Sequence, residues 1–181
     1  MAEKQFQDKM KGNERRNFIL RLLQSSAEAV TGGELADKTN VSRQIIVQDI
    51  SILKAHNHPI IATSQGYIFM HEEGHSRTER VFACRHESSP DVTEDELALI
   101  VEHGGSIVNV VIEHQLYGDL TAALQLHTLQ DVQKFISRLK ATKAPLLSQL
   151  TDGVHLHTVT ADSEEQLDEI EQALQAKGFL L

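Results

Sequence analysis

The chain has 181 residues, of which 40% are hydrophobic and 24% charged, and its formal net charge is −9. This length suits one or two domains, each with a core of its own. We expect a cytoplasmic protein without a membrane interaction, because no apolar run is long enough to cross a bilayer and the polar amino terminus is unlike a signal peptide.

The first part of the chain predicts three helices followed by a hairpin. Apolar residues recur on one face from about 13 to 24, and Thr31 opens a second helix through a capping-box pattern. Ser42 begins a third helix with an apolar stripe. Two β-rich runs, 60–63 and 67–70, flank a turn that contains glycine. This order predicts a winged helix-turn-helix.

The third helix has the features of a DNA-reading helix. Its N-terminus is polar, and Arg suits guanine, Gln suits adenine, and Ser suits phosphate. The DNA-binding candidates are Ser42, Arg43, Gln44 and Gln48. An ordinary solvated helix face is the alternative. We expect this DNA-binding domain to span residues 1–71.

Residues 72–76 are polar and contain glycine, which predicts a linker. The balance of charged residues differs between the two sides of this linker. Residues 1–71 carry nine Lys or Arg against seven Asp or Glu, whereas residues 72–181 carry eight against nineteen. DNA binding depends on the local electric field, so the negative total does not exclude the first part.

Residues 77–181 predict an α+β domain. Its elements are a strand at 78–86, a helix at 94–103, strands at 106–113 and 119–126, a helix at 129–140, a strand at 154–160 and a helix at 163–177. Capping boxes at Thr93 and Ser163 mark two helix starts. The order βαββαβ with an added helix suggests a ferredoxin-like sandwich. Residues 146–148 receive no assignment.

His155 and His157 stand two residues apart in a predicted strand, so their rings point to the same face. This spacing can chelate a transition metal, although two hydrogen-bonded or solvated histidines would give the same pattern. His86 and Glu94, at the ends of the first strand and the next helix, are candidate partners. The set would suit tetrahedral zinc, or four of six positions around nickel or iron. The single cysteine, Cys84, is expected to be a small buried side chain.

Several stretches resemble niacin-responsive transcriptional repressors. Residues 41–50 and Gly66-Tyr67 resemble their winged helix. Residues 86–94, Gly104-Gly105, residues 112–118 and residues 153–158 resemble their three-histidine (3H) domain. Gln65 departs from the arginine that often precedes Gly-Tyr in the wing.

The resemblance implies a repressor of niacin uptake and NAD-precursor genes, with nicotinic acid as co-repressor. It implies one transition-metal ion per chain, most often nickel, with zinc or iron as alternatives. The metal ligands it implies are His86, Glu94, His155 and His157. His114 and Tyr117 match a stretch of the family's ligand pocket.

We expect a homodimer, because paired reading helices address half-sites in successive major-groove turns of operator DNA. A regulator that senses the metal itself is an alternative. A metal-dependent enzyme acting on a pyridine compound is a third possibility, but no motif supplies a separate general base or nucleophile, and the winged helix would then have no role. We therefore expect a protein that is not an enzyme.

Overall fold

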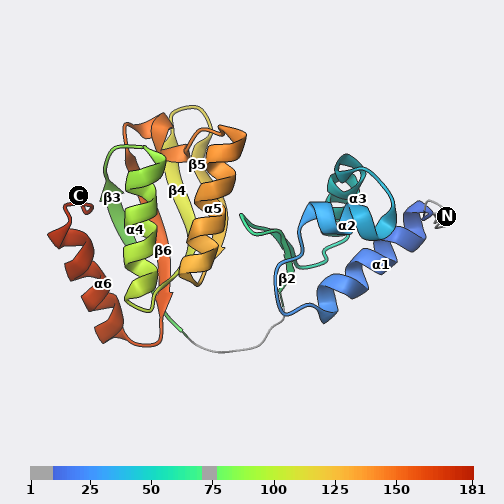
Figure 1. Cartoon of the computed structure of the whole chain (residues 1–181), viewed down its shortest axis with the longest axis horizontal. Helices are drawn as coiled ribbons and strands as arrows, with labels where there is room; N and C mark the ends of the chain where they lie inside the picture. Colours follow the sequence, from blue (N-terminus) through green and yellow to red (C-terminus); the bar gives the residue numbers. More distant parts are fainter. Residues whose placement is uncertain (1–9, 71–76) are drawn as a thin grey trace, which may run out of the picture. The chain divides into compact units, whose positions relative to one another are not determined.

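The computed structural model describes residues 10–70 and 77–181. Contacts divide the chain into two compact units, Met1–Glu73 and Gly74–Leu181, which are considered separately below (Figure 1). The linker expected at 72–76 lies outside the described residues, apart from the unit boundary itself.

The N-terminal unit has the predicted winged helix-turn-helix. Its elements are α1 (Gly12–Ser25), α2 (Gly32–Thr39), α3 (Arg43–Ala55), β1 (Ile60–Ala62) and β2 (Tyr67–Phe69). The Thr31 capping box is present at the start of α2, and Asn40 ends that helix in a left-handed conformation. β1 and β2 pair antiparallel as the wing. Buried side chains from all three helices and from β1 form one core.

The C-terminal unit is an α+β sandwich. Its elements are β3 (Thr78–Arg85), α4 (Pro90–Glu102), β4 (Ser106–His114), β5 (Gly118–Leu126), α5 (Leu129–Thr142), the 3-10 helix η1 (Leu147–Thr151), β6 (Val154–Ala161) and α6 (Glu164–Ala176). The four strands form an antiparallel sheet in the order β3-β6-β4-β5. Apolar residues of α4, α5 and α6 share one core with one face of the sheet (Figure 1). The predicted βαββαβ order is confirmed.

Helix α4 starts four residues earlier than the sequence analysis placed it. The hydroxyl of Ser89 accepts a hydrogen bond from the Val92 N–H, and Pro90 occupies the first turn. Thr93 is therefore not the N-cap; it lies inside the helix and is buried. The buried residues of α4 are Thr93, Glu96, Leu97 and Ile100, so Glu96 is the acidic side chain of this helix that faces the core.

Strand β6 directs its histidines toward the helices. His155 and His157 are each 3% exposed, whereas Val154 and Leu156 are 36% and 37% exposed on the other face. The alternation follows from the two-residue period of a strand. The histidine pair therefore lies between the sheet and α4, on the face that the helices cover.

Candidate functional site

Three histidine rings converge on one buried carboxylate in the C-terminal unit. The carboxylate belongs to Glu96 of α4, which is fully buried. His86 follows β3, and its Nε2 lies 2.8 Å from Oε2 of Glu96. From β6, Nε2 of His155 lies 3.2 Å from Oε1, and Nε2 of His157 lies 3.5 Å from Oε2. Three separate chain segments thus bring four potential metal-binding groups together.

Each of these rings uses its other nitrogen in the same way. In all three, Nδ1 donates a hydrogen bond to a backbone carbonyl oxygen, because a carbonyl can only accept. In chain order the acceptors are Glu87, Gly153 and Asn109, at 2.9, 2.9 and 3.0 Å. A neutral imidazole with its proton on Nδ1 presents a lone pair at Nε2. Three lone pairs then face a carboxylate, and this set of acceptors fits a bound cation, with the carbonyls orienting the ligand rings.

Without a metal, the Glu96 carboxylate favours the protonated forms of two of these rings. Burial lowers the pKa of His86 and of His157, but the carboxylate of Glu96 outweighs burial through hydrogen bonding and charge, so both pKa values rise. Burial raises the pKa of Glu96, but the three histidines outweigh it and hold that pKa well below its ordinary value. The metal-free group therefore favours an ionised Glu96 beside protonated His86 and His157.

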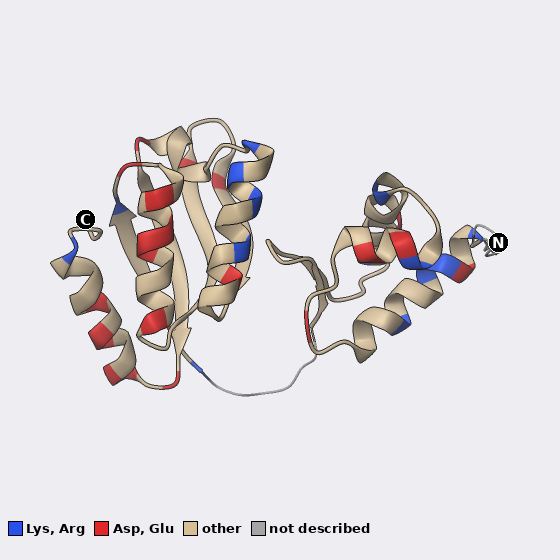
Figure 2. Cartoon of the chain, in the orientation of Figure 1, with Lys and Arg blue, Asp and Glu red and all other residues tan. Residues whose placement is uncertain are grey.

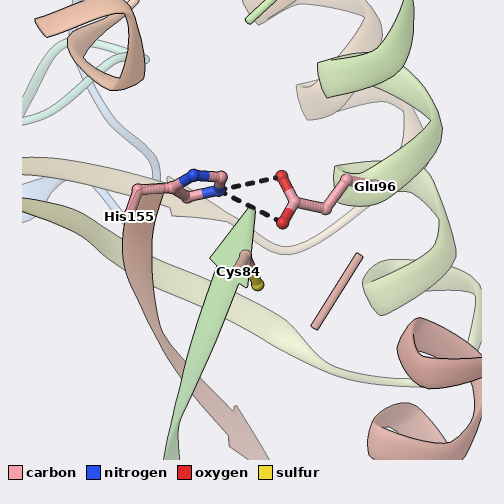
Figure 3. A group of neighbouring side chains, drawn as sticks. All are labelled: Cys84, Glu96 and His155. Atoms are coloured by element: carbon pink, nitrogen blue, oxygen red, sulfur yellow. Dashed lines mark hydrogen bonds and ion pairs between the residues drawn. The ribbon is translucent and has the colours of Figure 1, made fainter. Parts of the chain in front are cut away.

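Cys84 also lies beside this group. It stands opposite His155 in the β3–β6 pairing, and both side chains are buried. One potential ligand atom each from Cys84, Glu96 and His155 lies within 4.8 Å of the others (Figure 3). Burial, followed by the charge of Glu96, raises the pKa of the Cys84 thiol, which disfavours the thiolate. The three imidazoles with Glu96 are therefore the stronger donor set, and Cys84 is an adjacent thiol that the sequence analysis did not connect with the site.

The acidic member of the group is Glu96, and the geometry corrects the expectation that placed Glu94 there. Glu94 is partly exposed, and its carboxylate lies 3.6 Å from Nζ of Lys140 on α5. Two residues along a helix correspond to opposite sides of it, so only one of these two carboxylates can face the histidines.

His114 and Tyr117 lie at the turn between β4 and β5, and their rings stack with centroids 5.0 Å apart. Tyr117 is 69% exposed, and the His114 Nδ1 accepts the backbone N–H of Leu116 at 3.2 Å. Neither residue lines the cavity beside the histidines. The structure therefore keeps these two candidates together but separates them from the metal-ligand candidates.

A cavity of about 230 Å³ adjoins the three histidines and Glu96. Its walls are mostly apolar and come from α4, the sheet, α5 and the segment before η1; they include Leu97, Val110, Ala122, Phe135 and Leu146. A cavity of roughly 150 Å³ can hold benzene, so this one is large enough for a single aromatic ring with a small polar substituent. The arrangement offers an apolar compartment with a polar end.

The DNA-binding candidates all lie on the surface, three of them at the start of α3 and Gln48 farther along it. Ser42, Arg43, Gln44 and Gln48 are exposed. Ser42 is the N-cap residue by position, but its side chain makes no capping hydrogen bond. Acidic residues gather on α4 and α6 of the other unit, whereas the N-terminal unit mixes both signs (Figure 2). The geometry leaves these four side chains accessible to a nucleic-acid partner.

Two arginines of α1 have a role that the sequence analysis did not predict. Arg15 and Arg16 both bind the buried carboxylate of Asp49 on α3. The Arg15 Nε lies 2.5 Å and the Arg16 Nη1 3.2 Å from its oxygens. These arginines therefore join α1 to α3.

Comparison with known proteins matches both units. A 3H domain model covers residues 79–181, and an HTH domain model covers residues 15–68. The transcription repressor NadR of Bacillus subtilis (strain 168) is 53% identical over 175 residues, which are 96% of each chain. The probable transcription repressor NiaR of Thermotoga maritima is 39% identical over 168 residues, covering 93% of this chain and 94% of that protein. Among the described residues, no helix has both the length and the apolar character needed to span a membrane.

Proposed function

This chain belongs to the family of transcription repressors that carry an HTH domain followed by a 3H domain, and we propose that nicotinic acid is its co-repressor, sensed by a metal-containing 3H domain. The target genes would be those of niacin uptake and NAD-precursor supply. The observation that carries the proposal is the convergence of three Nε2 atoms and one carboxylate at the end of an apolar cavity. In a chain whose relatives include two named transcription repressors, such a site would serve for sensing.

His86, Glu96, His155 and His157 would hold the metal, one ion per chain. Three imidazoles and one carboxylate suit nickel, zinc or iron. Four protein ligands leave two positions open around a six-coordinate ion, and the bound metal would there attract the carboxylate of an effector. The chain's own residues would orient the rings, offset part of the ion's charge through Glu96 and exclude water with apolar walls.

The metal site is tested by comparing two isosteric variants of α4. We expect Glu96→Gln to bind nickel at least tenfold more weakly, because the carboxylate charge and one ligand oxygen are lost. Glu94→Gln is the matched control and should bind nickel as the unmodified chain does, because Glu94 pairs with Lys140. Affinity is measured by titration of the full chain after removal of metal. Equal losses in both variants, or in neither, would refute the assignment.

The effector is tested through DNA. The full chain is loaded with metal, and its operator affinity is measured by fluorescence anisotropy with and without nicotinic acid at fixed salt. We expect tighter operator binding with nicotinic acid, since a co-repressor binds the DNA-competent state more strongly. If chelation abolishes operator binding and nicotinic acid has no effect, the chain is a metal-sensing regulator instead.

The operator contacts are proposed for the exposed N-terminal end of α3. Arg43 and Gln44 would reach base edges, with Ser42 on phosphate and Gln48 one turn further along. Arg43→Ala should weaken operator binding by about tenfold or more and relax sequence preference. A uniform loss on all DNA sequences would instead assign Arg43 to phosphate.

We propose a homodimer through the sheet face that the helices leave open. This face carries exposed apolar side chains, including Val81 at 55% and Leu156 at 37%. A second copy is the occupant that a helix-turn-helix reader of paired half-sites requires. Leu156→Glu should shift the chain from dimer to monomer in sedimentation velocity at unchanged helical content. A variant that remains dimeric would exclude this face.

A further inference from the structure

Thr93 of α4 lines the cavity beside the histidines and is 8% exposed. Among the described residues, its Oγ1 is the buried side-chain oxygen or nitrogen for which no hydrogen-bond partner is found. A helical threonine commonly donates to the carbonyl four residues earlier. Here the Ser89 carbonyl accepts the Thr93 backbone N–H at 3.0 Å, and the hydroxyl takes no part. An unsatisfied buried hydroxyl destabilises the protein unless something else binds it.

The other polar side chains that line this cavity have partners. Ser148 accepts the hydroxyl of Ser88 at 2.9 Å, and the histidines and Glu96 bind one another. The remaining lining residues include Leu124, Phe135 and Leu139 and offer no hydrogen-bonding side chain. The cavity therefore presents two polar places to a ligand, namely the metal-ligand group and the Thr93 hydroxyl.

These two places are one helical turn apart. Thr93 and Glu96 are three positions apart in α4, so their Cβ atoms stand roughly 5–6 Å apart on one face. A ligand with its carboxylate at the metal group would present a polar atom on the far side of a small ring to the hydroxyl. A pyridine nitrogen is such an atom, because it accepts a hydrogen bond and a hydroxyl can donate one.

We infer that the Thr93 hydroxyl donates a hydrogen bond to the ring nitrogen of a pyridine monocarboxylate and is the residue that distinguishes it from a benzene monocarboxylate of the same shape. The inference rests on the proposed function, which supplies the pyridine carboxylate. A buried hydroxyl left without a partner disfavours the ring that lacks the nitrogen, and this is a strong source of discrimination between otherwise similar ligands. The apolar walls would bind both rings equally.

The experiment is calorimetric titration of the nickel-loaded full chain with nicotinic acid and with benzoic acid. We expect the unmodified chain to bind nicotinic acid about tenfold more tightly than benzoic acid. Thr93→Val, which replaces the hydroxyl by a methyl group of similar volume, should lose about tenfold for nicotinic acid and leave benzoic acid unchanged. Thr93→Ser keeps the hydroxyl and should keep the preference.

A second measurement separates recognition from a merely structural role. In the ligand-free chain, Thr93→Val should raise the unfolding temperature by roughly 4–8 °C, since it removes the unpartnered hydroxyl. A lowered unfolding temperature, or an equal loss for both acids, would overturn the role of Thr93 while the proposed function stood. Failure of the unmodified chain to bind nicotinic acid at all would refute the proposed function and this inference with it.

Discussion

At the scale of single residues, Gly153 contacts the backbone of His86 and the ring of His155, two members of the histidine group. Its φ of +88° lies in the left-handed region, and a Cβ at this position would collide with the backbone carbonyl of His86. Its own carbonyl accepts Nδ1–H of His155 at 2.9 Å. Gly153→Ala should therefore displace His86 or His155, weaken nickel binding by at least tenfold and lower the free energy of unfolding by more than about 1 kcal/mol. Nickel titration and chemical denaturation measure the two effects.

Gly178→Ala is the matched control for that variant. Gly178 also has a positive φ, +73°, but nothing lies within 4 Å of the position that its Cβ would take. Gly178→Ala should lower the free energy of unfolding by about 1 kcal/mol, the conformational cost of a left-handed alanine, and leave nickel affinity unchanged. If both glycine variants bind nickel equally well, close packing at Gly153 does not position the histidines.

The sequence grouped the three histidines with Glu94, whereas the structure places Glu96 beside them, and the difference has a physical reason. Treating Thr93 as the N-cap placed Glu94 in the first turn, where the helix dipole favours an acid. The Ser89-Pro90 pair is a competing start signal that places Thr93 inside the helix. Thr93 and Glu96 lie on the inward face that Leu97 and Ile100 define. The spacing of Leu97 and Ile100 fixes the inward face of the helix, so that spacing could have identified Glu96 from the sequence.

At the scale of elements, α1 and α3 are joined by a buried ion pair. Asp49 is 2% exposed, and Arg15 is 8% exposed with its Nε 2.5 Å from the carboxylate. Asp49→Asn keeps the shape but leaves a buried guanidinium without its counter-charge. We expect the N-terminal unit to lose about 3 kcal/mol of stability, measured by urea denaturation. Operator affinity should fall with it, because α3 carries the residues proposed to contact the operator.

Arg16→Gln provides the comparison for this ion pair. The Arg16 side chain is 22% exposed and lies 3.2 Å from the same carboxylate, so water compensates for much of what is lost. Arg16→Gln should lower the free energy of unfolding by well under half as much as Asp49→Asn does. Equal costs would mean that burial does not determine the strength of these contacts.

The elements themselves were largely predictable because local signals agree with the fold. Capping boxes, apolar stripes and strand alternation predicted the three helices and the wing, and the βαββαβ order of the second unit. Helix η1 (Leu147–Thr151) was missed, since a short 3-10 helix has no apolar period to detect. The pairing of Arg15 with Asp49 was missed because it joins residues 34 positions apart.

At the scale of the whole molecule, the chain combines two units with separate hydrophobic cores. One core is built around Ile19, Leu35 and Ile46, and the other around Leu97, Ile107 and Val159. The change in charge along the sequence had indicated this division. Nicotinic acid and the metal would bind the C-terminal unit, whereas operator DNA would bind the N-terminal unit.

Calorimetry of the full chain should therefore resolve two unfolding transitions. Nickel at about 100 times its dissociation constant contributes roughly 2.7 kcal/mol to the unit that binds it, which should raise that transition by about 10 °C and leave the other in place. Asp49→Asn should lower only the transition that nickel does not move, so the two changes identify which unit unfolds in each. A single transition that responds to both changes would show that the two units unfold cooperatively. Ligand binding to the C-terminal unit would then affect DNA binding by stabilising both units together, not by switching one separately folded unit.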